Sequence, residues 1–187
     1  MTKLALTLSA AAALFALAAC DEKPAPAPTT KPAGTSTAAP KPAASDIPAT
    51  LFLTAAPADA KDIKDAKPTL KAGDKVTLTG RIGGSEEPFV DGRAVFTIVD
   101  SHIKDCDQMG EKGHCKTPWD YCCEPSDDLA KASATVQVVG ADGKPLKSSL
   151  KDVHGLKPLA TVVVVGTVAS VEGGSLVVNA SGMHLKN

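Results

Sequence analysis

The sequence predicts a mostly β domain, a small five-stranded barrel that begins near residue 50 and follows a proline-rich segment. Apolar and polar side chains alternate from Val76 to Ile82, which is the period of a strand with one buried face. Similar apolar runs follow along the chain, separated by Asp-Gly and Gly-Gly turn signals. Between the third and fourth runs there is room for only a short helix. These three observations favour an all-β fold with minor helix.

The strands are predicted in order from these runs. The first, at 76–82, is ended by Gly83 and Gly84. The second, at 94–99, is rich in β-branched and aromatic residues. The remaining strands are expected at 134–139, 160–168 and 176–180, and the last could continue to residue 185. The fourth contains four consecutive valines, a pattern typical of a strand buried on both faces.

Two short helices are expected, one before the first strand run and one between the third and fourth. One lies within 59–66, with Ile63 as its buried contact, and the other lies around 146–153. Neither run is long enough to form a major element. Both are therefore expected to connect or cover the strands.

Five strands with a short helical connection between the third and fourth, and a tight hairpin joining the last two, resemble the element order of an OB-fold. The resemblance covers about residues 70–187. A small β-sandwich would show similar alternation and stays open as an alternative. The OB-fold resemblance implies a ligand-binding face around the second and third strands, which is where a cysteine-rich insert occurs.

The insert, residues 101–131, lies between the second and third predicted strands and contains Cys106, Cys115, Cys122 and Cys123. An even number of cysteines in an exported domain favours two disulfides. A bond between the neighbours Cys122 and Cys123 is disfavoured by geometry, so each of them is expected to pair with Cys106 or Cys115. A bridge that closes a loop of this size contributes about 3 kcal/mol on the chain-entropy model.

The same residues allow a metal site, in which His102 or His114 joins some of the thiolates. Thiolate and imidazole ligands suit zinc or cuprous copper. The spacing argues against zinc, since the usual Cys-x2-4-Cys pairs are absent and adjacent cysteines point apart in most backbones. A redox-active pair is a third interpretation, although the chain has no Cys-x-x-Cys motif.

Trp119 and Tyr121 lie next to the cysteine pair. They either pack on the cysteines as a small core of the insert or form one wall of a binding surface. Pro118 fits both interpretations, because it favours an extended or turn geometry.

The N-terminus has the layout of a secretory signal peptide, with Lys3 followed by a short apolar run. The run ends in Leu17-Ala18-Ala19-Cys20, which resembles the lipobox of bacterial lipoproteins. The resemblance implies cleavage after residue 19, lipid on Cys20 and a membrane anchor facing the periplasm. Asp21 resembles the inner-membrane retention signal of some Gram-negative lipoproteins, so the inner membrane is favoured.

Residues 20–49 are predicted to be a disordered tether. Seven of the chain's 14 prolines lie between Asp21 and Pro48, with almost no large apolar residue among them. At about 3.1 Å per residue, a proline-rich spacer of this length reaches roughly 80 to 90 Å. The chain is therefore divided into a signal peptide at 1–19, a tether at 20–49 and a domain at 50–187.

Composition and motifs exclude several functional classes. The net charge is −1 and aromatic residues make up 3% of the chain, so nucleic acid is not an expected partner. The motifs of serine hydrolases, P-loop proteins and zinc proteases are absent, so no enzyme is predicted. The expected function is a non-enzymatic binding module that contacts an envelope protein or another envelope component. The alternative is a thiol-dependent protein that binds or traffics copper or zinc.

Overall fold

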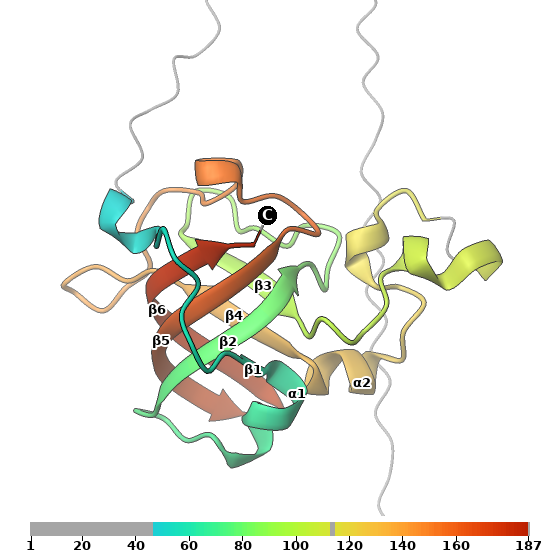
Figure 1. Cartoon of the computed structure of the whole chain (residues 1–187), viewed down its shortest axis with the longest axis horizontal. Coiled ribbons are helices and arrows are strands. Elements are labelled where there is room, and N and C mark those ends of the chain that lie inside the picture. Colours follow the sequence, from blue (N-terminus) through green and yellow to red (C-terminus); the bar gives the residue numbers. More distant parts are fainter. Residues whose placement is uncertain (1–46, 113–114, 187) are drawn as a thin grey trace, which may run out of the picture. The chain divides into compact units, whose positions relative to one another are not determined.

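The computed structural model describes residues 47–112 and 115–186 (Figure 1). Its centre is a closed sheet of five strands, in the order β2-β3-β4-β6-β5, and β5 pairs back onto β2. Their bounds are Lys75–Ile82 for β2, Val95–Val99 for β3, Ser133–Gln137 for β4, Thr161–Glu172 for β5 and Ser175–Leu185 for β6. The sheet is mixed, because β4 and β6 run parallel while the other pairs of these five are antiparallel. The predicted five-stranded OB-like barrel is confirmed, and the single closed sheet is not a sandwich.

The barrel is least tightly closed between β2 and β3. Only Arg81 and Ile82 of β2 pair with β3. The neighbouring stretch of β2 instead pairs with β1 (Lys61–Asp62), which lies parallel to Leu78 and Thr79. The short helix α1 (Ile63–Ala66) follows at once, and Ile63 is fully buried, as the sequence predicts.

Aliphatic side chains and one aromatic pair fill the inside of the barrel and form the core. The rings of Phe89 and Phe96 lie 5.8 Å apart between centroids. Val162, Val163 and Val164 are all buried, which agrees with the expectation of a strand covered on both faces. Gly166 has no room for a side chain, because an added Cβ would collide with the backbone oxygen of Asn179.

The helix predicted around 146–153 is wrong. The structure has only a 3₁₀ helix, Val153–Gly155, and Asp152 and His154 adopt left-handed backbone conformations with φ of 64° and 49°. The hydroxyl of Ser149 accepts the backbone N–H of Lys151, a local bond that competes with helix formation. The segment still contributes buried Leu150 to the core.

The N-terminal part of the described chain lies on β6. Leu53 donates its backbone N–H to the oxygen of Met183 over 2.7 Å, and the ring nitrogen Nδ1 of His184 lies 3.0 Å from the oxygen of Leu53. The predicted signal peptide, Cys20 and nearly all of the predicted tether lie outside the described residues. In the part of the chain that the structure describes, no helix is long and apolar enough to cross a membrane.

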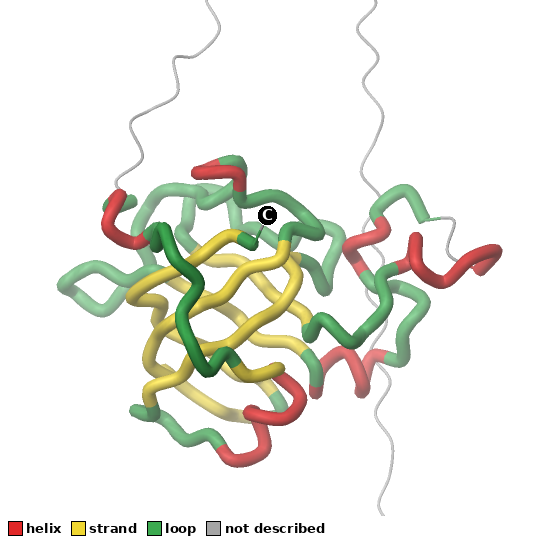
Figure 2. The backbone as a smooth tube through the Cα atoms, viewed as in Figure 1, coloured by secondary structure: helices red, strands yellow, loops and turns green. Residues whose placement is uncertain are grey.

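The insert follows β3 and returns to the barrel at β4, as predicted. Figure 2 shows that the barrel is built of strands, whereas the insert consists of short helical turns and loops. These turns are two 3₁₀ helices, Cys106–Lys112 and Pro118–Asp120, and the short helix α2 (Ser126–Lys131).

Candidate metal centre

The insert brings its four cysteines to one point. Cys106 begins the first 3₁₀ helix and Cys115 follows it; Cys122 and Cys123 follow the second, after one intervening residue. All four Sγ atoms lie within 4.8 Å of one another. The separations are 2.9 Å for Cys115–Cys122, 3.6 Å for Cys106–Cys122, and 4.0 Å for both Cys115–Cys123 and Cys122–Cys123. We call these four residues the thiol cluster.

No pair in the thiol cluster is joined by a disulfide. The printed sulfur separations are 2.9 Å or more, whereas a disulfide requires an S–S distance of about 2.05 Å. The predicted disulfides are therefore not formed in this structure. The closest pair, Cys115 and Cys122, belongs to one of the two connectivities that the sequence leaves open.

The separations suit a shared metal ion. Zinc–sulfur bonds of about 2.3 Å in tetrahedral geometry place their sulfurs about 3.8 Å apart. Three of the four separations given above, from 3.6 to 4.0 Å, are close to that value. The Cys115–Cys122 distance of 2.9 Å would need to lengthen by about 1 Å for such a site.

The adjacent cysteines do not point apart, contrary to expectation. Cys122 and Cys123 are the central residues of a turn closed by the N–H of Glu124, which donates to the oxygen of Tyr121 over 2.9 Å. Tyr121 enters this turn in the left-handed conformation, with φ of 58°. Successive side chains alternate between faces in a strand but not in a turn, and the two sulfurs therefore come within 4.0 Å of each other.

The thiols of the cluster differ in acidity. Burial raises the pKa of Cys106, but hydrogen bonds from the Cys123 N–H and from the other three thiols outweigh it and lower the pKa overall. The pKa of Cys122 is raised, mainly by its hydrogen bond with Cys115. The pKa of Cys123 is also raised, mainly by its hydrogen bond with Cys106. Cys106 therefore loses its proton before Cys122 and Cys123, and a thiolate is the form that binds metal.

The carboxylate of Asp120 accepts hydrogen bonds that hold the turn of the thiol cluster in place. Its Oδ1 accepts the backbone N–H of Cys122 over 2.8 Å and lies 3.8 Å from the sulfur of Cys106. Its Oδ2 accepts the hydroxyl of Thr117 over 2.9 Å. Burial raises the pKa of Asp120, but these hydrogen bonds lower it overall, so the carboxylate stays charged and fixes the turn that carries the cysteine pair.

Trp119 and Tyr121 attach the insert to the end of β2. Tyr121 is fully buried, so its side chain packs in the interior and offers no binding surface. Trp119 is half-buried; its indole N–H donates to the oxygen of Glu86 over 2.9 Å, and its own oxygen accepts the N–H of Gly84 over 2.8 Å. Sequence reasoning did not identify the role of the neighbouring Gly83, where an added Cβ would lie 2.5 Å from the Trp119 oxygen.

His102, one of the two histidines proposed as metal ligands, is not placed with the sulfurs. His102 is exposed, and its Nδ1 lies 3.1 Å from Asp100 and 3.7 Å from Asp62. These three residues form a separate group of possible ligands. Asp100 is already bonded, because its carboxylate accepts the backbone N–H groups of Lys64 and His102 over 2.9 Å each. His114 lies outside the described residues.

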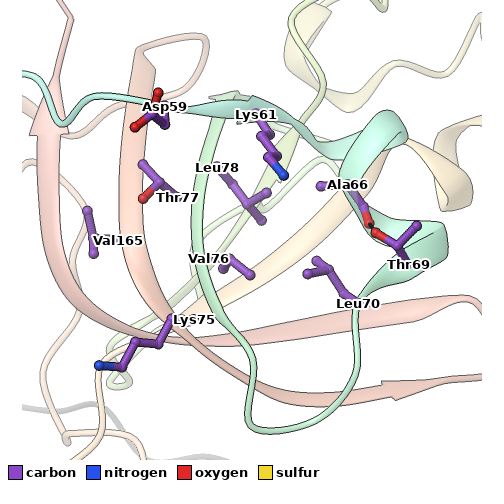
Figure 3. Close-up of a pocket in the computed structure, with 10 residues that line it drawn as sticks. All are labelled: Asp59, Lys61, Ala66, Thr69, Leu70, Lys75, Val76, Thr77, Leu78 and Val165. Atoms are coloured by element: carbon purple, nitrogen blue, oxygen red, sulfur yellow. Dashed lines mark hydrogen bonds between the residues drawn. The ribbon is translucent and has the colours of Figure 1, made fainter.

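A separate pocket of about 410 Å³ lies between β2 and the segment that carries α1 (Figure 3). Its lining includes apolar Leu70, Val76 and Leu78, and Figure 3 shows Lys75 pointing out of it. None of the lining residues comes from the insert. Sequence reasoning did not find this pocket, because no motif marks a space that forms only when α1 packs beside β2.

Comparisons with protein-family models, with curated protein sequences and with solved structures gave no match to this chain. The thiol cluster is the strongest concentration of chemically reactive side chains among the described residues. Its four soft ligands in mutual contact form a set that can bind a thiophilic metal ion.

Proposed function

We propose that this domain binds one thiophilic metal ion, Zn²⁺ or Cu⁺, through Cys106, Cys115, Cys122 and Cys123. The observation that carries the proposal is the convergence of four sulfur atoms within 4.8 Å of one another. Soft thiolate ligands select zinc and cuprous copper over magnesium and calcium, which take oxygen ligands. Metal binding displaces the thiol protons, so affinity rises with pH.

The protein is further proposed to be a non-enzymatic lipoprotein of the cell envelope. The lipobox-like run ending at Cys20 supports a lipid anchor, and the proline-rich segment supports a tether between membrane and barrel. The domain would then face the periplasm, with the inner membrane favoured by Asp21. Its partner would be an envelope protein or another envelope component that meets the insert.

A second candidate function is an interaction module whose insert is closed by disulfides. The 2.9 Å separation of Cys115 and Cys122 favours it, because an oxidant could join these sulfurs with little movement. Cys106 and Cys123 would form the other bridge. Export to an oxidising compartment would promote both bonds.

One mass measurement separates the two functions. The full chain carrying Cys20→Ser, which leaves only the four insert thiols, is purified without reductant and examined by native and denaturing mass spectrometry. We expect one bound Zn²⁺ or Cu⁺ under native conditions and the mass of four thiols under denaturing conditions. A chain that is lighter by four hydrogen atoms and holds no metal, even after reduction and incubation with each ion, would overturn the metal proposal.

Variants of the same chain supply the matched controls. Cys106→Ser removes the most buried ligand and is expected to abolish stoichiometric metal binding. Asp120→Ala leaves all four sulfurs but removes the carboxylate that fixes their turn, and should weaken metal affinity about 10- to 100-fold. Asp127→Ala, at an exposed carboxylate in α2, should leave affinity unchanged.

A further inference from the structure

The four sulfurs of the thiol cluster differ in their access to solvent. Cys106 is buried and Cys115 is half-buried, whereas Cys122 and Cys123 are exposed. A metal ion held by all four can be approached from the side of the adjacent pair. Structural zinc sites are usually closed by their four ligands, whereas reactive metal sites keep a position open to incoming groups.

The insert is attached to the barrel through contacts that involve none of the four cysteines. The guanidinium of Arg81 contacts the carboxylate of Asp105 over 2.5 Å and donates to the oxygen of Ile103 over 2.6 Å. Gly84 donates its N–H to the oxygen of Trp119. In metal-dependent folds, by contrast, the binding free energy of the metal is folding free energy. The contacts that attach this insert to the barrel therefore contribute stability that does not depend on a bound metal.

We propose that the thiol cluster is a transfer site, in which the exposed pair Cys122 and Cys123 exchanges its metal bonds with a dithiol acceptor while Cys106 and Cys115 hold the ion. The inference rests on the proposed metal-binding function and adds the class of partner. An acceptor with two neighbouring thiols fits because it replaces two adjacent soft ligands with two of the same kind. Exposure of the pair gives such an acceptor direct access.

The exchange conserves atoms, protons and electrons. The two metal–sulfur bonds to Cys122 and Cys123 break as two metal–sulfur bonds to the acceptor form. Each acceptor thiol gives up a proton, and each released cysteine thiolate takes one. The metal keeps its oxidation state throughout. A second dithiol molecule then displaces Cys106 and Cys115 in the same way, with two bonds broken, two formed and two protons passed to the released thiolates, and completes the transfer.

The test uses the full chain carrying Cys20→Ser, loaded with Zn²⁺, and dithiothreitol as the acceptor. Zinc remaining on the protein is followed by native mass spectrometry. We expect a tenfold rise in dithiothreitol to raise the loss rate about tenfold, as for attack by an incoming thiolate. The monothiol 2-mercaptoethanol at equal thiol concentration should act more slowly. Zinc loss at a rate independent of dithiothreitol would overturn the proposal, and so would equal rates with the two reagents.

Two further readouts locate the exchange and separate it from the parent proposal. Brief alkylation during transfer should label Cys122 and Cys123 before Cys106, and equal labelling would overturn the assigned order. Emission from Trp119, the chain's single tryptophan, should stay constant as zinc leaves, since the docking contacts remain. A large shift would instead show a structural metal. A chain that binds neither Zn²⁺ nor Cu⁺ refutes the proposed function itself, before any exchange is measured.

Discussion

At the scale of single residues, Tyr121 combines complete burial with an unsatisfied hydroxyl. Within the part of the chain that the structure describes, its OH and the Nε of Arg81 are the buried side-chain polar atoms without a hydrogen-bond partner. The ring packs against Gly83, where an added Cβ would lie 2.8 Å from it. A buried hydroxyl without a partner destabilises a fold by about 1–3 kcal/mol. The buried phenol therefore lowers the stability of the fold.

Burial should make Tyr121 titrate far above the usual range. Desolvation raises its pKa from 10.0 to about 12; Arg81 opposes the shift, and Asp105 and Cys106 add to it. Because Tyr121 is the chain's single tyrosine, ultraviolet absorbance of phenolate reports this group alone. We expect the folded, metal-free protein to titrate near pH 12 and the chain in denaturant near pH 10. A folded-state value near 10 would show that the ring is exposed.

The same shift links stability to pH. The folded pKa lies above the unfolded one, so the contribution of Tyr121 is complete below pH 10 and is lost as the pH rises to about 12. The free energy of unfolding should therefore fall more steeply across this window than in Tyr121→Phe. At neutral pH, Tyr121→Phe should be more stable by about 1 kcal/mol, because the unpartnered hydroxyl is gone. Urea denaturation of both proteins at several pH values measures both effects.

At the scale of elements, one ion pair attaches the insert to β2. The side chains of Arg81 and Asp105 are 12% and 5% exposed. Removal of one member leaves the other charge buried, which destabilises a protein by about 3–5 kcal/mol. We expect Asp105→Ala to lose this much in urea denaturation and to shift the emission of Trp119 as the insert loosens.

The neighbouring Asp107 is the matched control for Asp105. It is an exposed carboxylate two positions away in the same insert. Asp107→Ala should change stability by less than about 0.5 kcal/mol. Equal losses in the two variants would show that total insert charge matters, rather than the Arg81–Asp105 contact.

Strand periodicity predicted the barrel because one buried face imposes a period of two on each strand. The runs that contain Val76, Phe96 and Val164 all became strands of the closed sheet. The same reasoning failed at 146–153, where a local bond from Ser149 and left-handed Asp152 prevent a helix. The spacing of apolar residues predicts which side chains are buried. It does not show where a side-chain hydrogen bond to the backbone or a left-handed residue prevents a helix.

The candidate site was only partly predictable for a related reason. The sequence identified the four cysteines and left metal and disulfide interpretations open. Their convergence depends on the left-handed Tyr121 and on the turn that it begins. The docking role of Arg81 was also hidden, because in the sequence it is simply a polar residue of an alternating strand. Long-range contacts of this kind leave no periodic signal.

At the scale of the whole molecule, the insert and the N-terminal segment of the described chain contact different strands of the barrel. The insert leaves between β3 and β4, whereas the N-terminal segment is bonded to β6 through Leu53. A lipid anchor on the N-terminal side of the barrel therefore need not block access to the thiol cluster in the insert. A tethered domain gains reach from its linker while its site stays open to partners.

This arrangement requires that Cys20 be lipidated, which membrane fractionation can test. Two or three acyl chains give stable anchoring, at about 0.8 kcal/mol per buried CH₂, whereas an unlipidated domain has no such affinity. In a Gram-negative host, we expect the natural chain in the membrane fraction and Cys20→Ser in the soluble fraction. Cys115→Ser, which removes a different cysteine, should remain with the membrane. Tight membrane association of Cys20→Ser would locate the attachment elsewhere in the chain. Metal binding by the insert would be unaffected by that result, because the thiol cluster and the anchor share no residue.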